Sequence, residues 1–457
     1  MSLAACAVGP DYVRPETPTG VTWHAPLEGG LTGLAPDQAA LARFWTALDD
    51  PLLSQLVERS LAGSYAVADA EARLRQARAL RKIAIGEFFP TISASASAQR
   101  AHTKSPGSAA NVDLYSAGLD ASWEIDLFGR LRRNLEAANA DRDAAEDDLR
   151  DVQVSLVGEL ALAYVDTRAL QERVHIAEAT LASQIETFDI TNWRAQAGLT
   201  TDLDVEQARF SLALTRATIP ALRTALAADM NGIAILIGEQ PGALAELLET
   251  PQPIPVTPLE VAVGVPADAL AQRPDVRRAE RALAAQTARI GVATANAYPS
   301  LNALGSIGLD ALTPGGLFRA GAWTGSLAAT ATQTLFAGGQ IVGAIEAQDA
   351  VRDQVLASYQ STVLAALGEV ENALVAYAQE QNRRQALADG AAAAEQALAL
   401  AQHQYGSGLI DFQVVLDSQR SLYLLQDQLA ASEGQVTSNL VRLYKAIGGG
   451  WTRGAPS

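Results

Sequence analysis

The chain has 457 residues, 49% of them hydrophobic, and its 51 acidic against 34 basic residues give a formal net charge of -17. This length and composition allow a large core or several domains, which excludes a disordered chain. The negative charge argues against nucleic acid as a partner. One cysteine and four widely separated histidines predict no internal disulfide, no metal site and no bound cofactor.

Signatures of enzymes and of membrane-spanning helices are also absent. The sequence has no GxSxG elbow, no GxxxxGK[ST] loop and no GxGxxG motif after a strand. No stretch reaches the roughly 18 uninterrupted apolar residues of a spanning helix. We therefore do not expect an enzyme, and a bilayer would be crossed only by a closed β-barrel.

The only cysteine is Cys6, within LAACAVGPDYVRP at Leu3–Pro15. Taken alone, this thiol is equally compatible with a nucleophile, a chance residue or an attachment point. The five residues before it are too few for the apolar region of about 7 to 15 residues in a secretory signal. We therefore expect no functional export signal in the sequence as written.

Internal repetition is the strongest organisational signal. The segments Ala70–Ile92 and Ala279–Leu301 align without gaps, and both helical patterns stop at an aromatic-proline pair, Phe89-Pro90 or Tyr298-Pro299. The matching pairs are Ala70/Ala279, Glu71/Glu280, Leu74/Leu283, Ala79/Ala288, Ala84/Ala293 and Pro90/Pro299. After each proline the hydrophobic period changes to two, which predicts strands. The chain is therefore expected to contain two structural repeats.

Each repeat is predicted to hold one β-hairpin, at about 91–127 and about 300–336. In the first, Tyr115 and Trp123 alternate with polar residues, whereas in the second Leu304 falls on the polar face. Strands of about 10 residues can cross a bilayer when tilted, although half-buried strands of soluble sheets look alike. Because the smallest membrane barrels need about eight strands, four strands would require an oligomer to close one.

A long helical hairpin is predicted after each β-hairpin, at about 130–237 and about 340–447. Between Leu131 and Asn192 there is no proline, and apolar residues recur in steps of three and four. Such a helix spans roughly 90 Å. Paired long helices usually serve as scaffolds or partner-binding surfaces, but their combination with membrane-length strands suggests a tube.

Both long helices are expected to turn back at glycine-containing segments, Arg194–Arg209 and Gln404–Arg420. Pro220 is expected to break the first returning helix, because proline removes a helical hydrogen bond. A proline-rich linker, Pro251–Pro258, joins the two halves.

Six stretches, in this order and spacing, resemble the TolC-like outer-membrane factors, in the lipoprotein branch that serves RND drug-efflux pumps. They are VGPDYVRP (Val8–Pro15), FWTALDDPLL (Phe44–Leu53), WEIDLFGRLR (Trp123–Arg132), the segment Arg273–Leu301, YGSGLIDFQVVLDSQRSL (Tyr405–Leu422) and LYKAIGGGW (Leu443–Trp451). The resemblance implies a lipidated extended segment (1–47), a first repeat (48–250), a linker (251–265), a second repeat (266–447) and a tail (448–457).

The resemblance also implies a mainly α-helical protein with a membrane β-barrel. Three copies would form a homotrimeric, 12-stranded β-barrel, with four strands from each protomer, continued by a long α-helical periplasmic tunnel. Its implied function is the exit duct of a tripartite efflux system, with a periplasmic adaptor and an inner-membrane RND transporter as partners. The implied location is the outer membrane, in contact with its lipids.

In this family the tunnel closes at its periplasmic tip, near the helix turns, and the residues of this aperture correspond here to Asp417 and Arg420. The two lie three apart on one predicted helical face. Asp202 or Asp204 of the first turn is their expected partner. Three copies of Asp417 near a threefold axis would repel one another or recruit a cation. Taken alone, an Asp/Arg pair at this spacing is most often a surface salt bridge. Relatives have an apolar residue one turn before this Asp, where the chain has Gln413, so the resemblance does not predict a hydrophobic constriction there.

Other functions fit parts of the pattern. A type I protein-secretion duct shares the architecture, and a soluble helical scaffold or adaptor accounts for the helices alone. The charge of -17 either lines the tunnel, favouring cationic compounds, or lies on a solvated exterior. Finally, Leu3-Ala4-Ala5-Cys6 resembles a lipoprotein processing box, which implies a covalent lipid on Cys6 and a signal sequence preceding the first residue given.

Overall fold

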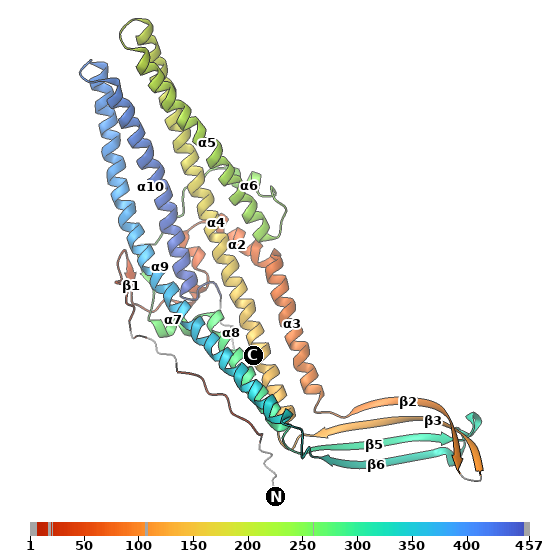
Figure 1. Cartoon of the computed structure of the whole chain (residues 1–457). Helices are drawn as coiled ribbons and strands as arrows, with labels where there is room; N and C mark the ends of the chain where they lie inside the picture. The colour runs from red at the N-terminus through yellow and green to blue at the C-terminus, as the bar shows by residue number, and fades with distance from the viewer. Residues whose placement is uncertain (1–6, 17–19, 21, 106–107, 259, 452–457) are drawn as a thin grey trace. The chain divides into compact units, whose positions relative to one another are not determined.

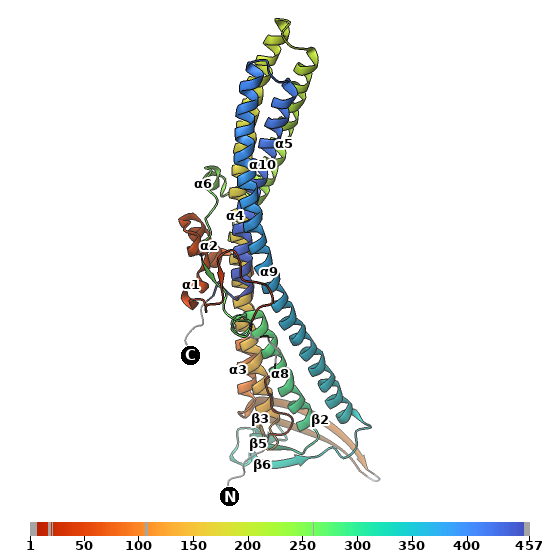
Figure 2. The ribbon, with the colours of Figure 1, turned by 90° about the vertical axis from the view of Figure 1, so that its left-hand side faces the viewer.

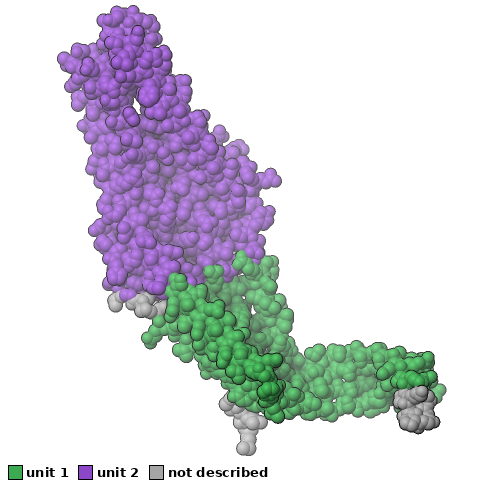
Figure 3. Space-filling view, viewed as in Figure 1, with its two compact units in different colours: residues 1–16, 72–147, 278–361 green, residues 17–71, 148–277, 362–457 purple. Residues whose placement is uncertain are grey.

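The computed structural model describes residues 7–16, 20, 22–105, 108–258 and 260–451. These residues fall into two compact units, coloured separately in Figure 3. Unit 1 consists of Met1–Glu16, Ala72–Asp147 and Arg278–Ser361, and unit 2 of Thr17–Glu71, Asp148–Arg277 and Thr362–Ser457. Each unit therefore collects segments from both sequence repeats.

Unit 1 contains a four-stranded antiparallel sheet in the order β2–β3–β5–β6 (Figure 1). The strands are β2 (Thr91–Ser105), β3 (Ser108–Ile125), β5 (Ser300–Ala311) and β6 (Trp323–Thr332), with the short 3-10 helices η2 (Pro314–Gly316) and η3 (Ala320–Ala322) between the last two. The β3–β5 pairing joins the hairpins of the two repeats. Both predicted hairpins are thus present, and in the described part of the chain no strand pairs with the outer edges of β2 and β6.

The strand register gathers apolar residues on one face of the sheet. Residues directly opposite each other on neighbouring strands share a face. One row across the sheet is Ala94, Leu119, Ile307 and Gly325, and the adjacent row, on the other face, is Ser93, Asp120, Ser306 and Ser326. Leu304 lies opposite Ser122, in a polar row, as its sequence position predicted. The apolar face is uncovered in the single chain, where Leu119 is 49% exposed and Leu327 89%.

Two pairs of long antiparallel helices dominate the remainder of the fold, and each pair lies side by side in both views (Figures 1 and 2). The pairs are α4 (Arg130–Gln196) with α5 (Asp202–Ile237), and α9 (Gln340–Gly406) with α10 (Phe412–Ala446). The helices α3 (Tyr65–Gly86) and α8 (Pro274–Ala295) precede the two β-hairpins. Both α4 and α9 have 67 residues and start 210 residues apart, which confirms the repeat at the level of structure.

The prediction that Pro220 breaks the first returning helix is wrong. The helix α5 continues from Asp202 to Ile237 with Pro220 inside it. Proline costs one backbone hydrogen bond, but long helical segments on both sides hold the backbone in place. Nearby, the Thr218 hydroxyl donates to the Thr215 carbonyl and the Thr224 hydroxyl to that of Pro220, each at 2.8 Å. The helix therefore continues through the proline without a break.

The surface of α5 is unusually apolar for a helix that is mostly exposed in the single chain. In the described part of the chain it is the one helix long and apolar enough to cross a membrane, a test that core helices also pass. Only 17% of its apolar window is buried. Leu203, Phe210 and Leu214 are 66%, 67% and 50% exposed. Much of this helix is therefore without a partner in one protomer.

The main core lies in unit 2, where smaller elements pack on the long helices. These elements are β1 (Leu31–Thr32), α1 (Gln38–Ala42), η1 (Phe44–Leu48), α2 (Pro51–Gly63), α6 (Ala245–Glu249), β4 (Val261–Ala262) and α7 (Pro266–Gln272). Leu53 and Leu56 of α2, Leu160 of α4, Ile233 of α5 and Leu440 of α10 are completely buried in one cluster. This core fixes both helical hairpins at their ends remote from the turns.

Candidate functional site

The first helix turn, between α4 and α5, is built on a glycine in the left-handed conformation. Gly198 has a φ of 71°, which a residue without Cβ adopts at little cost. The Gly198 N–H donates to the Ala195 carbonyl at 2.9 Å, and the Leu199 N–H to the Arg194 carbonyl at 2.8 Å. These two bonds define a Schellman cap, which satisfies the last carbonyls of α4.

The second turn, between α9 and α10, repeats this geometry. Gly408 has a φ of 75°. Its N–H donates to the Tyr405 carbonyl at 3.0 Å, and the Leu409 N–H donates to the Gln404 carbonyl at 2.9 Å. The two turns are therefore the same structural unit, occurring once in each repeat.

The two first-turn acids predicted as aperture residues have different surroundings. Asp204 accepts hydrogen bonds from the Thr201 backbone N–H at 3.1 Å and hydroxyl at 3.0 Å, and a very short one from the Thr200 hydroxyl. Partial burial acts to raise the pKa of Asp204, but these bonds outweigh it and hold that pKa below its usual range. Asp202 is exposed and has no partner among the described residues. Asp204 thus serves its own helix cap, whereas Asp202 is free to meet another chain.

The second-turn residues lie together on one exposed face of α10. Gln413, Asp417 and Arg420 are all exposed, as their spacing on a helix predicts. The Gln413 side-chain amide donates to Asp417 Oδ1 at 3.1 Å. Within the described part of the chain Asp417 and Arg420 form no ion pair with each other, so both charges remain available to a partner.

A further pair that connects the two turns, Arg194 with Tyr405, was not predicted from the sequence. The Arg194 guanidinium carbon lies 4.6 Å from the centroid of the Tyr405 ring, a cation–π contact. Tyr405 also packs on Phe412, with ring centroids 5.2 Å apart. The Arg194 Nε and the Tyr405 hydroxyl are buried with no hydrogen-bond partner in the described part of the chain. The available signal was the position of both residues just before a turn glycine.

Polar contacts farther from the turns also join the first hairpin to the second. The pairs are Thr187–Gln419 at 2.8 Å, Thr218–Tyr423 at 3.2 Å and Arg173–Asp427 at 2.8 Å. Each contact replaces hydrogen bonds to water, so its net contribution to the free energy of the fold is small. Together these contacts hold the two hairpins against each other, but separating the hairpins would cost only a modest free energy.

Comparison with known proteins identifies the family to which this chain belongs. The profile of the family described as "Outer membrane efflux protein" matches residues 56–239 and 265–449, which include both helix turns. The chain belongs to the outer membrane efflux protein family. The predicted resemblance to outer-membrane factors is therefore confirmed. The chain is an outer-membrane efflux channel protein of a pump system, located in the outer membrane, and not an enzyme.

Individual members of the outer membrane efflux protein family match this chain from end to end. The solvent efflux pump outer membrane protein SrpC of Pseudomonas putida is 31% identical, over 99% of this chain and 97% of its own length. Nodulation protein T of Rhizobium leguminosarum bv. trifolii is also 31% identical, over 98% and 95%. This coverage shows that the likeness is not confined to one repeat.

Solved structures of outer membrane efflux proteins have the same fold. The outer-membrane channel OprN superposes with a TM-score of 0.92 at 36% identity, covering 98% of this chain and 100% of that one. The open state of the Neisseria gonorrhoeae MtrE outer membrane channel superposes with a TM-score of 0.85 at 26% identity, covering 99% and 100%. The chain thus has the fold of an outer-membrane efflux channel subunit.

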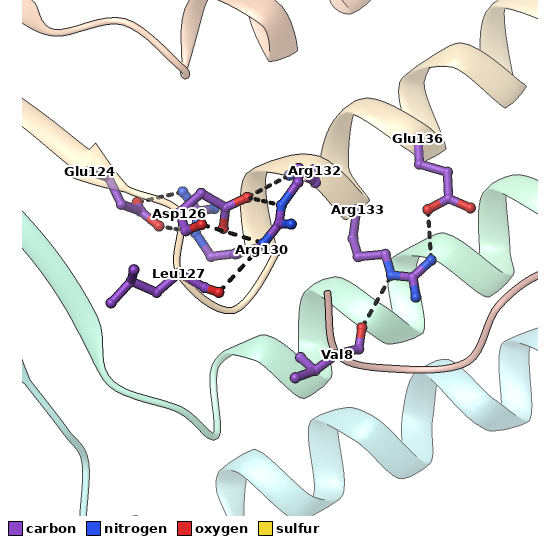
Figure 4. Close-up of polar contacts among 8 residues, drawn as sticks. All are labelled: Val8, Glu124, Asp126, Leu127, Arg130, Arg132, Arg133 and Glu136. Atoms are coloured by element: carbon purple, nitrogen blue, oxygen red, sulfur yellow. Dashed lines mark hydrogen bonds and ion pairs between the residues drawn. The ribbon is translucent and has the colours of Figure 1, made fainter. Parts of the chain in front are cut away.

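A second polar cluster lies in unit 1 of this efflux protein, where β3 ends and α4 begins (Figure 4). Arg130 forms a two-bond ion pair with Glu124, at 2.7 and 2.6 Å. The Asp126 carboxylate accepts from the Arg132 backbone N–H at 3.0 Å and from its side chain at 3.1 Å. A carboxylate at this position satisfies an unpaired N–H of the first helical turn. Side chains of the stretch WEIDLFGRLR (Trp123–Arg132) therefore stabilise the backbone where β3 ends and α4 begins.

Proposed function

We propose that three copies of this chain form the outer-membrane exit duct of a tripartite efflux pump, with a periplasmic adaptor and an inner-membrane RND transporter. The observation that carries the proposal is the four-stranded sheet, with one continuous apolar face and two unpaired edges. Four strands are too few to close a barrel, but three such sheets supply twelve. Closure would satisfy the backbone groups of both edges within the bilayer.

The long helices support a tunnel below such a barrel. At 1.5 Å per residue, the 67 residues of α4 or α9 extend roughly 100 Å. The exposed apolar residues Leu203, Phe210 and Leu214 of α5 give neighbouring protomers a surface on which to pack. In this arrangement the helix turns form the end of the tunnel remote from the membrane.

The proposed gate is a ring of charges at the helix turns. Asp417 and Arg420 are exposed and unpaired with each other, and Asp202 is the first-turn acid without a partner in its own chain. Between protomers, Arg420 would bind Asp202 and thereby hold neighbouring hairpins together. Asp204 is the less suitable latch residue, because its carboxylate already caps α5.

The proposed membrane attachment includes a covalent lipid on Cys6, which lies outside the described residues. Several acyl chains on one residue give stable anchoring. The lipid would leave the channel activity to the barrel and tunnel, since it contributes no group to either.

The transported compounds are proposed to be small toxic molecules, including drugs and solvents. The relative SrpC is named as a solvent efflux protein, which supports this class. Deletion of the gene in its host, followed by growth on drugs, dyes, solvents, metal ions and a secreted-protein assay, tests the proposal. Sensitivity to several small compounds, shared with deletion of one adjacent pump, supports a drug-efflux duct. Loss of one secreted protein with unchanged drug resistance contradicts it and supports a secretion duct.

A further inference from the structure

Two glutamines are buried between the first helical hairpin and the second, and each has an amide oxygen without a partner. Gln184 of α4 and Gln419 of α10 are each only 4% exposed. The Oε1 atom of each accepts no hydrogen bond from the described part of the chain. A buried acceptor that has lost water without gaining a donor costs free energy, which an apolar side chain of similar size would avoid. Packing alone therefore does not explain these two amides.

The orientation of the Gln419 amide is set by the hydroxyl that it contacts. Its amide nitrogen donates to Thr187 Oγ1 at 2.8 Å, and that hydroxyl donates its single proton to the Ser183 carbonyl at 2.9 Å. Because the hydroxyl has no second proton, it must accept from the amide nitrogen, which leaves the amide oxygen unpaired. The Gln184 amide nitrogen donates to the Ser211 hydroxyl at 3.3 Å. Both glutamines therefore lack a hydrogen-bond donor.

Both glutamines line one cavity of about 170 Å³ between α4, α9 and α10. Among the described residues, no side chain that lines it is charged, and its apolar wall includes Leu398 and Leu422. Tyr423 lines the cavity as well, with its hydroxyl 3.2 Å from that of Thr218. The terminal torsion of a glutamine is broad, so a modest rotation turns either amide oxygen toward a molecule in the cavity. The cavity thus combines unused acceptors with an uncharged, partly apolar lining.

The sequence repeat does not account for the two glutamines. The 210-residue offset between the repeats relates Gln184 to Ala394 of α9 and Gln419 to Arg209 of α5. Neither equivalent residue is an amide, so the pairing of the long helices does not by itself require glutamine at these positions. The two buried amides are therefore particular to this cavity.

We propose that the cavity binds a small neutral phenol with two hydroxyl groups, a dihydroxybenzene, and that the bound molecule joins the first hairpin to the second. The two unused oxygens require two donors, and the uncharged lining disfavours an ion. An apolar cavity of about 150 Å³ holds one benzene ring, so a cavity of about 170 Å³ suits a ring with small polar groups. Since Gln184 and Gln419 belong to different hairpins, a molecule that donates to both connects them.

A molecule in this site stabilises the packed arrangement of the hairpins. It binds both glutamines only while they face the same cavity, so it shifts the equilibrium toward that arrangement. The site itself depends on the described helices alone. The consequence that such a molecule opposes opening of the channel rests on the proposed function.

Hydrogen exchange tests the site directly. The full chain, purified in amphipol, is titrated with resorcinol, with phenol, and with m-xylene, which has the shape of resorcinol but no donor. Exchange of the amides of residues 180–190 and 416–426 should slow about tenfold at a resorcinol concentration about ten times its dissociation constant. Phenol should need roughly tenfold higher concentrations, because one acceptor stays unpaired, and m-xylene should need higher ones still.

The double variant Gln184→Met/Gln419→Met keeps the side-chain volume and removes both acceptors. Its response to resorcinol should fall to the response to m-xylene. Gln396→Met is the matched control, an exposed glutamine of α9 outside the cavity, and should respond as the wild type does. No effect of resorcinol on the wild type, equal effects of resorcinol and m-xylene, or a full resorcinol effect in the double variant would overturn the site. If the double variant loses helical content, Gln184→Met alone decides.

Discussion

The two helix turns have the same backbone, but different interactions hold them. Both end in a Schellman cap around a glycine, Gly198 or Gly408, 210 residues apart. At the position where α5 begins with the exposed Asp202, α10 begins with Phe412, which is only 3% exposed. The first turn is thus closed by polar capping bonds and the second by a small apolar core.

This difference decides which acidic side chains near the turns are already used in helix caps. The capping box of the first turn occupies Asp204, because its carboxylate bonds Thr200 and Thr201. The second turn needs no acid for its cap, since Asp411 at the N-cap makes no side-chain capping bond. Asp417 and Arg420 lie exposed on the surface of α10, and neither takes part in the cap of that helix. One backbone design therefore spends an acidic side chain on the cap in the first repeat and none in the second.

The largest effect is expected from removing the aromatic anchor of the second turn. Tyr405→Ala deletes the ring that packs on Phe412 and Arg194, and should lower the local opening free energy by about 2 kcal/mol, since the ring is only partly buried. Hydrogen exchange of residues 404–416 measures this loss. Tyr405→Phe is the control, and we expect no loss because its hydroxyl has no partner. A destabilised Tyr405→Phe protein would show that the Tyr405 hydroxyl makes a stabilising hydrogen bond.

A smaller effect, of the same size at both sites, is expected from Gly198→Ala and Gly408→Ala. Both glycines have positive φ and open space around the position of a Cβ, so the cost is backbone strain of about 1 kcal/mol at either site. Hydrogen exchange of the two turns should report similar losses. Clearly unequal losses would contradict the view that the two turns share one backbone design.

A smaller, pH-dependent effect is expected from Asp204→Asn. The lowered pKa of Asp204 means that its ionised form stabilises the fold; this contribution is complete above the ordinary aspartate pKa and is lost as the pH falls through the lowered value. The substitution should cost roughly 0.5 to 1 kcal/mol at neutral pH. The protection of the amides of residues 201–207 against hydrogen exchange should therefore differ between variant and wild type at pH 7. In acid the two proteins should become equally protected. A difference as large in acid as at pH 7 would contradict this assignment.

The smallest effect is expected from Asp411→Ala. Because this N-cap makes no side-chain capping bond, its removal should cost less than about 0.5 kcal/mol, against the usual value near 1 for a working cap. Thr201→Ala in the first turn is the matched comparison and should cost more. If hydrogen exchange shows equal losses of amide protection in the two turns, the Thr201 and Asp411 side chains contribute equally to their caps, which would contradict the difference between the turns.

Much of the fold could be predicted from sequence because local patterns specify it. The change of period after Pro90 and Pro299 placed both β-hairpins, and the turn glycines placed the ends of α4 and α9. The prediction failed at Pro220, because the long helical segments on both sides keep the backbone helical despite the hydrogen bond that proline removes. The parallel pairing of β1 with β4 joins residues over 200 positions apart and left no local signal.

The site was only partly predictable. Helical spacing placed Gln413, Asp417 and Arg420 on one exposed face. The [ST]-x-x-[DE] pattern of Thr201 and Asp204 was an overlooked signal that Asp204, and not Asp202, serves as the cap. Arg194 and Tyr405 come from different repeats, so their contact depends on tertiary packing. The close approaches of Gly9 to Gly291 and of Gly129 to Ala7 were missed for the same reason, since the two residues of each pair are distant in sequence.

Single-channel conductance in planar bilayers tests most directly whether the exposed charges of the second turn close the channel. We expect a low closed-state conductance for the wild type, a several-fold rise for Asp417→Ala/Arg420→Ala, and no rise for Asp204→Asn, whose carboxylate caps its own helix. Unchanged closed-state conductance in the double variant would show that these two charges do not close the channel.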